Sequence, residues 1–212
     1  MSLGYQEPPA LVEEARPLVA DGYRALKLRV GDTPERDLAR VAAVRHAFGD
    51  GITILVDANT GYTVADVRRV MPGLEANDVG WLEEPFPAHD HRSYAQAATL
   101  GRVPLAAGEN QYTRFEFSRV IEDRVITILQ PDLSKTGGVT EALRIAALAS
   151  AWKLSINPHT SLTGLNMAAS IHLLAAIDNG GYFEGDVSKG NLFRDSLVHP
   201  GRVSGSTSTR SS

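Results

Sequence analysis

Short apolar runs rich in Val, Ile and Leu alternate with helical patterns along most of the chain. The apolar runs are nearly continuous, which is typical of parallel strands buried on both faces. We expect strands at Ala25–Val30, Ile52–Ala58, Val79–Glu84, Val103–Gly108, Thr127–Pro131, Leu154–Asn157 and Gly181–Glu184. We expect helices at Pro9–Ala20, Glu35–Phe48, Val64–Ala76, Arg92–Leu100, Arg114–Asp123, Thr140–Trp152 and Leu165–Ile177. This alternation predicts an α/β fold built from βα units.

The predicted elements fall one strand short of a closed eight-stranded barrel, and the missing strand belongs before the first helix, where residues 1–8 stand. We therefore expect a truncated TIM-like (β/α)7β barrel that lacks most or all of its first strand. Its domain should cover residues 1–200, followed by a disordered tail at 201–212 that is rich in Ser, Thr and Gly. Strands beside the gap would be exposed edges, which pair readily with other chains. Either residues 1–8 fill the gap or the protein forms a homo-oligomer.

Composition removes several classes of function. The 212 residues are 43% hydrophobic and 22% charged, as in an ordinary globular protein. A net charge of −4 gives no reason to expect nucleic acid or an anionic membrane as a partner. The absence of cysteine excludes disulfides, zinc–thiolate sites and thiol nucleophiles. No signal peptide or membrane-spanning stretch is visible, so we expect a cytoplasmic protein.

Three acidic residues recur at one fixed interval, each at the end of a predicted strand. Asp57 ends ITILVD, Glu83 follows VGWL and Glu109 ends VPLAAGE, with 26 residues from each to the next. One strand, one loop and one helix take about that length, so the same strand end recurs on consecutive units. Strand ends of a parallel barrel converge on one rim, and converging carboxylates repel unless a cation holds them. Their hard oxygen ligands suit Mg²⁺ or Mn²⁺.

The same period continues with other polar residues. Asp132 ends TILQPD, His159 ends LSINPH and Glu184 lies in GYFEGD. Lys27 and Arg29 lie on the run ALKLRV, where alternate residues share a face and should both point inward. A carboxylate on one imidazole nitrogen raises the basicity of the other, so Asp132 and His159 could form a general base. A buried histidine pair with no catalytic role is the alternative.

With these residues in place, the chain resembles the enolase superfamily, in its mandelate racemase/muconate lactonizing enzyme branch. The resemblance covers residues 22 to about 195 and rests on the motifs LKLR, LVDAN, WLEEP, AAGEN, QPDLSKTGG, NPH and YFEGD. It implies a modified barrel of eight strands and seven helices with an α+β capping domain, built mainly from an N-terminal segment that is absent here. It also implies a Mg²⁺ (or Mn²⁺) cofactor and a small carboxylate substrate such as a sugar acid.

The resemblance also assigns roles to individual residues. It implies metal ligands at Asp57, Glu83 and Glu109, and catalytic residues at Lys27, Asp132, His159 and Glu184. Arg29, Asn59 and Lys135 are the expected substrate-binding residues, and Lys135 occupies the place of the catalytic lysine of the muconate-lactonizing type.

Arg29 departs from the family pattern, which has a second lysine there. An arginine has a pKa above about 12 and cannot act as a base. Racemisation by two opposed bases needs one on each side of the carbanion, and only the His159 side is clearly equipped. This favours an acid-sugar dehydratase, in which one base removes the proton α to a carboxylate and a β-hydroxyl leaves.

Other interpretations stay open. A racemase, an epimerase or a cycloisomerase of the muconate-lactonizing type would use the same site. A Schiff-base lyase using Lys27 or Lys135 would leave the three evenly spaced carboxylates unexplained. A barrel without its capping domain could also be non-catalytic, with a bared rim containing Phe86, Tyr112 and Leu162.

Overall fold

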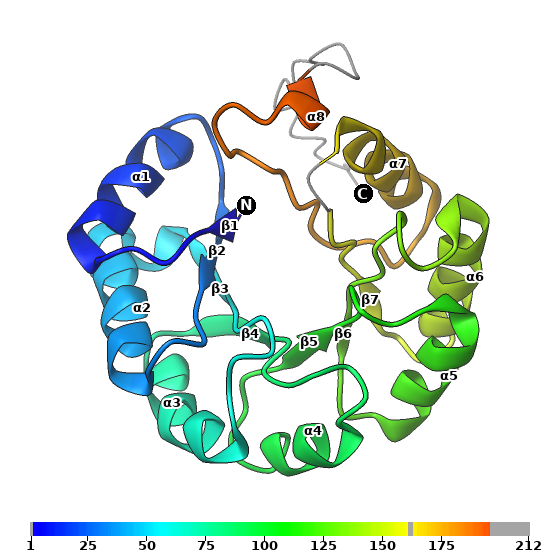
Figure 1. Cartoon of the computed structure of the whole chain (residues 1–212), viewed down its shortest axis with the longest axis horizontal. Coiled ribbons are helices and arrows are strands. Elements are labelled where there is room, and N and C mark those ends of the chain that lie inside the picture. The colour runs from blue at the N-terminus through cyan, green and yellow to red at the C-terminus, as the bar shows by residue number, and fades with distance from the viewer. Residues whose placement is uncertain (1, 161–162, 196–212) are drawn as a thin grey trace, which may run out of the picture.

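A computed structural model describes residues 2–160 and 163–195, and it confirms the α/β barrel architecture. Within these residues the strands form one parallel sheet in the order β1 to β7. Figure 1 shows the strands inside a ring of helices. Their bounds are β1 Ser2–Leu3, β2 Ala25–Arg29, β3 Thr53–Asp57, β4 Val79–Glu83, β5 Leu105–Ala107, β6 Ile128–Leu129 and β7 Ser155–Ile156.

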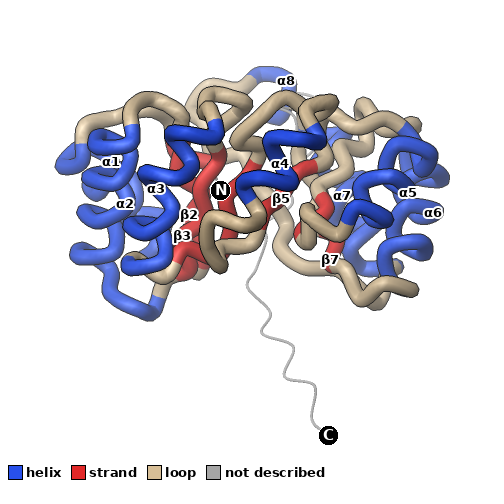
Figure 2. Tube along the Cα trace, turned by 90° about the horizontal axis from the view of Figure 1, so that it is seen from below, coloured by secondary structure: helices blue, strands red, loops and turns tan. Residues whose placement is uncertain are grey.

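Helices follow the strands as the sequence predicts, with ends that shift by at most three residues. Their bounds are α1 Pro8–Ala20, α2 Pro34–Phe48, α3 Val64–Ala76, α4 His91–Ala97, α5 Thr113–Asp123, α6 Gly138–Ser150 and α7 Gly164–Ala176. A 3₁₀ turn at Gly49–Gly51 and a short helix α8 at Leu192–Asp195 were not predicted. Figure 2 shows α8 at one edge of the molecule, away from the layer of strands.

Threonine side chains fix the start of three helices. Thr33, Thr63 and Thr163 each accept a hydrogen bond from a backbone N–H in the first turn of α2, α3 and α7. At α3 the Asp66 carboxylate accepts in return from the backbone of Thr63, which completes a capping box. These caps satisfy donors that a helix start leaves free, so the turns at the barrel rim are well defined.

The start of the chain fills the expected gap, as one of the two alternatives predicts, whereas the predicted last strand is absent from the described residues. The first position is occupied by β1, which pairs with β2 through Ser2–Lys27 and Leu3–Leu28. The predicted strand Gly181–Glu184 is wrong, because the chain there makes only an isolated bridge between Gly180 and Ile156. The Asn157 side chain accepts a 2.6 Å hydrogen bond from the Tyr182 amide, which takes that amide away from a strand ladder.

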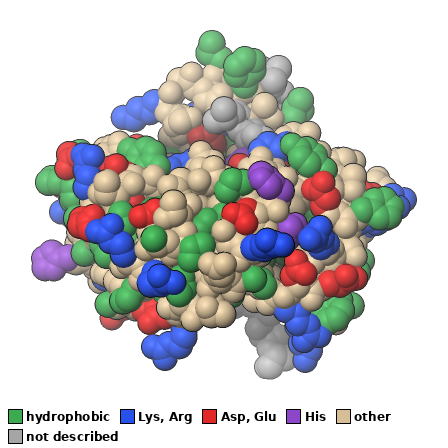
Figure 3. Space-filling view, turned by 60° about the horizontal axis from the view of Figure 1, so that its bottom comes forward, with side chains coloured by type: hydrophobic (Ala, Val, Ile, Leu, Met, Phe, Trp, Pro, Cys, Tyr) green, Lys and Arg blue, Asp and Glu red, His purple; other side chains and the backbone are tan. Residues whose placement is uncertain are grey.

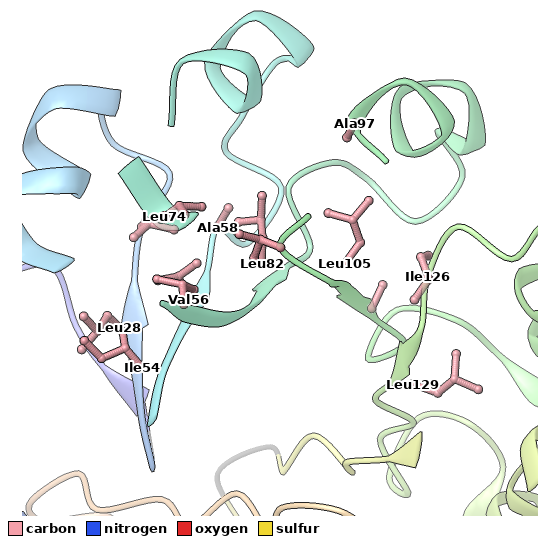
Figure 4. Close-up of a cluster of buried hydrophobic side chains, with 14 of the residues drawn as sticks. Leu28, Ile54, Val56, Ala58, Leu74, Leu82, Ala97, Leu105, Ile126 and Leu129 are labelled. Carbon is pink, nitrogen blue, oxygen red and sulfur yellow. The ribbon is translucent and has the colours of Figure 1, made fainter. Parts of the chain in front are cut away.

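Side chains on the two faces of the strands form two separate cores. Outward-facing residues such as Leu28, Ile54 and Val56 pack against the helices in one large cluster (Figure 4). Inward-facing Leu55 and Trp81 form a smaller cluster with Ala106 inside the barrel. Burial on both faces explains the nearly continuous apolar runs.

The alternation of the strands also decides where the charged residues point. Lys27, Asp57 and Glu83 lie two residues beyond Ala25, Leu55 and Trp81, which face the barrel interior. Alternate residues of a strand share a face, so these charged side chains form the next layer of the interior, at the carboxyl ends of the strands. The fold therefore positions them at the barrel mouth.

Several expectations concern the surface. Tyr112 is 50% exposed, as predicted. The prediction that Phe86 is exposed at the rim is wrong, because Phe86 is buried against the ring of Tyr94. Leu162 and the proposed tail lie outside the described residues.

None of the described helices combines the length and apolarity that crossing a membrane requires. On the face drawn in Figure 3, acidic and basic side chains are interspersed with apolar ones.

A buried ionic network ties the loops behind the barrel mouth together. The Asp37 carboxylate is fully buried and accepts hydrogen bonds from the amides of Gly31 and Asp32, the Tyr62 hydroxyl and the Arg40 guanidinium. These donors come from the loops after β2 and β3 and from α2. Removal of Asp37 would leave the buried Arg40 with the partly exposed Asp32, at 3.1 Å, as its remaining counter-charge.

We predict that Asp37→Ala lowers the free energy of unfolding by about 3–5 kcal/mol, the range for breaking a buried ion pair. Urea denaturation measures the change. The matched control is Glu35→Ala, which removes an exposed ion pair with Arg69 and should leave stability near the wild-type value. An equal effect of the two substitutions would contradict this account of the network.

Candidate active site at the barrel mouth

The strand register brings the predicted ligand residues to adjacent strand ends. Arg29 pairs with Asp57 across β2 and β3, and Asp57 pairs with Glu83 across β3 and β4. Glu109 comes two residues after β5, which pairs with β4 at Glu83 and Ala106. The three carboxylates therefore belong to three neighbouring strands at one end of the barrel.

The chain turns sharply directly after these strands. Asn59, Thr60 and Glu84 have φ values of 40°, 63° and 36°, in the left-handed region that non-glycine residues rarely adopt. Gly108 is required before Glu109, because its φ is 150° and a Cβ there would lie 2.6 Å from the backbone nitrogen of Gln130. Such unfavourable conformations are common where a fold positions functional side chains.

Each of the three carboxylates is held by a cationic side chain. Lys27 Nζ lies 2.7 Å from Glu83 Oε1 and 3.8 Å from Asp57 Oδ2. Arg29 Nη1 lies 3.0 Å from Asp57 Oδ2. The two groups form an ion pair, but the angle between them does not make a hydrogen bond. Glu109 faces Lys135 and His159 instead. The site therefore contains its own counter-charges.

Lys27 is the most enclosed of these cations. Its ammonium also lies 2.7 Å from Glu184 Oε1, and its side chain is almost fully buried. Burial by itself would lower the pKa of Lys27, but the charges of Glu83, Glu184 and Asp57 raise it well above its usual value. For Glu83 burial dominates and raises the pKa, although Lys27 opposes the shift. Lys27 is thus a permanent ammonium in this arrangement.

The predicted contact between Asp132 and His159 is present. His159 Nδ1 lies 2.8 Å from Asp132 Oδ2. The other oxygen, Oδ1, accepts hydrogen bonds from the Ser134 amide at 2.8 Å and from Asn166 Nδ2 at 3.0 Å. Asp132 is fully buried, so its carboxylate is a fixed acceptor that orients the imidazole.

The second nitrogen of His159 faces Glu109. His159 Nε2 lies 3.0 Å from Glu109 Oε2, and Lys135 Nζ lies 3.6 Å from Glu109 Oε1. Burial would lower the pKa of His159, but hydrogen bonds to Asp132 and Glu109 raise it to about 10. Burial would raise the pKa of Glu109, but His159 and Lys135 lower it to about 2. The ring is therefore an imidazolium at neutral pH in this arrangement.

The remaining predicted residues join the same network. Glu184 Oε2 accepts a long hydrogen bond of 3.4 Å from the Thr160 amide beside His159, so it connects the histidine with Lys27. Asn59 is exposed, and its amide donates a 2.9 Å hydrogen bond to Asp57 Oδ1. The ten predicted site residues thus form two contact groups, one around Lys27 and one around Glu109, which the backbone amide of Thr160 links.

Two residues of this region were missed by the sequence reasoning. Glu84 is 1% exposed, and its Oε2 accepts a 2.8 Å hydrogen bond from Asn110 Nδ2. Burial and the charge of Glu109 raise the pKa of Glu84 to about 7. The doubled acid in WLEEP and the Asn in AAGEN are visible in the sequence, but the 26-residue spacing selects only Glu83 and Glu109.

The three carboxylates are the kind of ligand that a hard divalent cation prefers. Asp57, Glu83 and Glu109 supply only carboxylate oxygens, and burial disfavours uncompensated charge on them. As the side chains stand, no three Asp, Glu or His residues of the described chain are gathered closely enough to hold a metal. In the described arrangement, cationic side chains lie beside all three carboxylates.

Comparison with known proteins gives the family. A family model described as "Enolase C-terminal domain-like" matches residues 10–209. A crystal structure of an enolase superfamily member from Polaromonas sp. JS666 is 55% identical with a TM-score of 0.90, and covers 92% of this chain and 52% of that one.

Curated relatives include two enzymes that act on sugar acids or their lactones. A D-galactonate dehydratase from Ralstonia nicotianae is 34% identical over 180 residues, which are 81% of this chain and 47% of the relative. A D-galactarolactone cycloisomerase from Agrobacterium fabrum is 34% identical over 158 residues, which are 74% of this chain and 42% of the relative. The chain spans about half the length of these curated relatives.

We predict that Glu109→Gln lowers the pKa of His159 from about 10 toward its ordinary value, because the substitution removes the charge beside Nε2. Nitrogen-detected NMR of the imidazole during a pH titration measures the shift. Asp66→Asn, in the capping box of α3, is the control and should leave the pKa of His159 unchanged. An unchanged His159 pKa in Glu109→Gln would contradict the pairing.

Proposed function

Because the chain belongs to the enolase superfamily, in its mandelate racemase/muconate lactonizing enzyme branch, we propose that it removes the proton α to the carboxylate of a sugar acid and eliminates water. The observation that carries the proposal is the hydrogen-bonded chain Asp132–His159–Glu109, next to the carboxylates at the barrel mouth. The dehydratases among its relatives support a sugar acid such as D-galactonate as the substrate class.

His159 is the group that transfers the proton. Asp132 fixes the ring through Nδ1, so Nε2 is the nitrogen that receives the α-proton. In the described arrangement Glu109 holds a proton on Nε2, and His159 becomes a base once that carboxylate turns away. The α-proton moves to Nε2, the C–H electron pair forms the new C=C bond as the C–O bond breaks, and the departing hydroxyl takes the proton back from His159, so that one water is lost.

The cationic pair on β2 binds rather than accepts protons. Lys27 remains an ammonium among its carboxylates, and a guanidinium such as that of Arg29 does not act as a base in proteins. Arg29 and Lys135 keep part of their side chains exposed and offer positive charge to a substrate carboxylate, while Lys27 holds Glu83 and Glu184 in place. We propose that Asp57, Glu83 and Glu109 hold Mg²⁺, which when bound would stabilise negative charge developing on that carboxylate.

Two alternatives are less well supported. A Schiff-base lyase needs a neutral lysine, and the raised pKa of Lys27 opposes that role. A racemase needs a base opposite His159, but Lys135 contacts the same Glu109 carboxylate as His159 and so lies on the same side. A cycloisomerase of the muconate-lactonizing type would use Lys135 itself as the base, although Glu109 pairs with its ammonium. The cycloisomerase among the relatives supports a cycloisomerase as the second candidate function.

We predict that the chain with Mg²⁺ exchanges the α-proton of D-galactonate in D₂O, and that His159→Asn slows the exchange by at least about 100-fold, the usual effect of removing a general base. Proton NMR measures the loss of the α-proton signal. His172→Asn, an exposed residue of α7, is the matched control and should keep the wild-type rate. Full exchange in His159→Asn would move the base elsewhere.

We further predict that Asp57→Asn and Glu83→Gln each weaken Mn²⁺ binding at least about tenfold, since each removes a charged oxygen ligand. Electron paramagnetic resonance of free Mn²⁺ measures the affinity. Glu75→Gln is the control, because this carboxylate contacts the Arg102 amide outside the barrel mouth. Mn²⁺ binding without α-proton exchange would favour the non-catalytic alternative.

A further inference from the structure

Glu109 is the meeting point of two hydrogen-bonded chains. On one side its Oε2 faces His159 Nε2 at 3.0 Å, and Asp132 holds that ring at 2.8 Å. On the other side its Oε1 accepts a hydrogen bond of 3.3 Å from Asn110 Nδ2, and the same amide donates to Glu84 Oε2 at 2.8 Å. The second chain has the same layout as the first, with a buried acid behind a side chain that contacts Glu109.

Glu84 is fixed more firmly than an ordinary loop acid. Its amide donates to the Ala106 carbonyl at 2.9 Å, and its carbonyl accepts from the Thr60 amide at 2.7 Å. These bonds hold its backbone at a φ of 36°, a conformation that glutamate rarely adopts. The neighbouring strands therefore determine where its carboxyl lies.

The Glu84 carboxyl is too enclosed to touch a substrate. Its Oε1 is buried and has no hydrogen-bond partner among the described residues, and its Oε2 accepts from Asn110. None of the described ion pairs that Lys27, Arg29, Lys135 and His159 make involves it. What this carboxyl can do is hold the amide of Asn110.

We propose that Asn110, held by Glu84, is a positioning residue that sets the orientation of the Glu109 carboxylate for cation binding. Lys135 Nζ lies 3.6 Å from the same Oε1 and competes for it. Glu109 Oε2 already faces His159, so the neutral Asn110 amide is the donor that opposes a shift of Oε1 toward Lys135. The inference rests on the proposed metal-dependent function and adds two residues to its machinery.

The test measures Mn²⁺ affinity by electron paramagnetic resonance together with the melting temperature. Asn110→Ala should weaken Mn²⁺ binding about 10-fold or more, the usual effect of losing a residue that orients a ligand. The matched control is Asn179→Ala, which removes amide hydrogen bonds to the carbonyls of Ala146 and Leu154. It should lower the melting temperature and leave Mn²⁺ affinity unchanged. Wild-type affinity in Asn110→Ala would overturn the proposal.

Glu84 gives a second, independent comparison. Glu84→Gln keeps a carbonyl oxygen that can accept from Asn110, so its Mn²⁺ affinity should stay within about threefold of the wild type. Glu84→Leu removes the acceptor and should weaken binding about as much as Asn110→Ala, by the same orienting effect. Equal affinities of the Gln and Leu variants would show that Glu84 does not act through Asn110.

The positioning role can also be separated from the metal itself. If the wild type binds no Mn²⁺, the proposed function fails, and crystal structures of the wild type and Asn110→Ala without metal then decide the inference. A Glu109 carboxylate that turns away from its wild-type orientation in the variant supports the positioning role. An unchanged orientation overturns it.

Discussion

The buried ammonium of Lys27 is the charge on which the arrangement of the barrel mouth depends. It lies 2.7 Å from both Glu83 and Glu184, which come from β4 and from the segment after α7. That segment makes only one backbone bridge to β7 at Gly180, so the ion pair with Lys27 and the contact of Tyr182 with Trp81 connect it to the opposite side of the barrel. Side chains therefore close the barrel where strand pairing is sparse.

Burial and the neighbouring cations give chemically equal carboxylates different pKa values. Glu83 is almost fully buried, and desolvation raises its pKa although Lys27 is in contact. Glu109 keeps some exposure and two cationic neighbours, and its pKa falls to about 2. Burial and charge act in opposite directions, and the balance differs between adjacent strands. Burial thus disfavours the charged form of Glu83, whereas the neighbouring cations favour the charged form of Glu109.

The sequence was sufficient for those features that repeat with the βα unit. Asp57, Glu83 and Glu109 follow from the spacing, because each unit ends its strand at the same rim. The strand predicted at Gly181–Glu184 failed because its composition suits a strand, while the Asn157 side chain binds the amide of Tyr182. Glu84 and Asn110 were missed for a similar reason. Their roles depend on side-chain contacts between units, which periodicity does not encode.

The asymmetry of the barrel mouth bears directly on the proposed reaction. One side carries His159, whose proton is controlled by Asp132 and Glu109, while the β2 side carries Lys27 and Arg29, which both keep their protons. A reaction that removes a proton on one face and loses a hydroxyl needs no second base, whereas racemisation does. The substitution of arginine for the family's second lysine is therefore a chemical restriction, since arginine keeps the positive charge and gives up the ability to accept a proton.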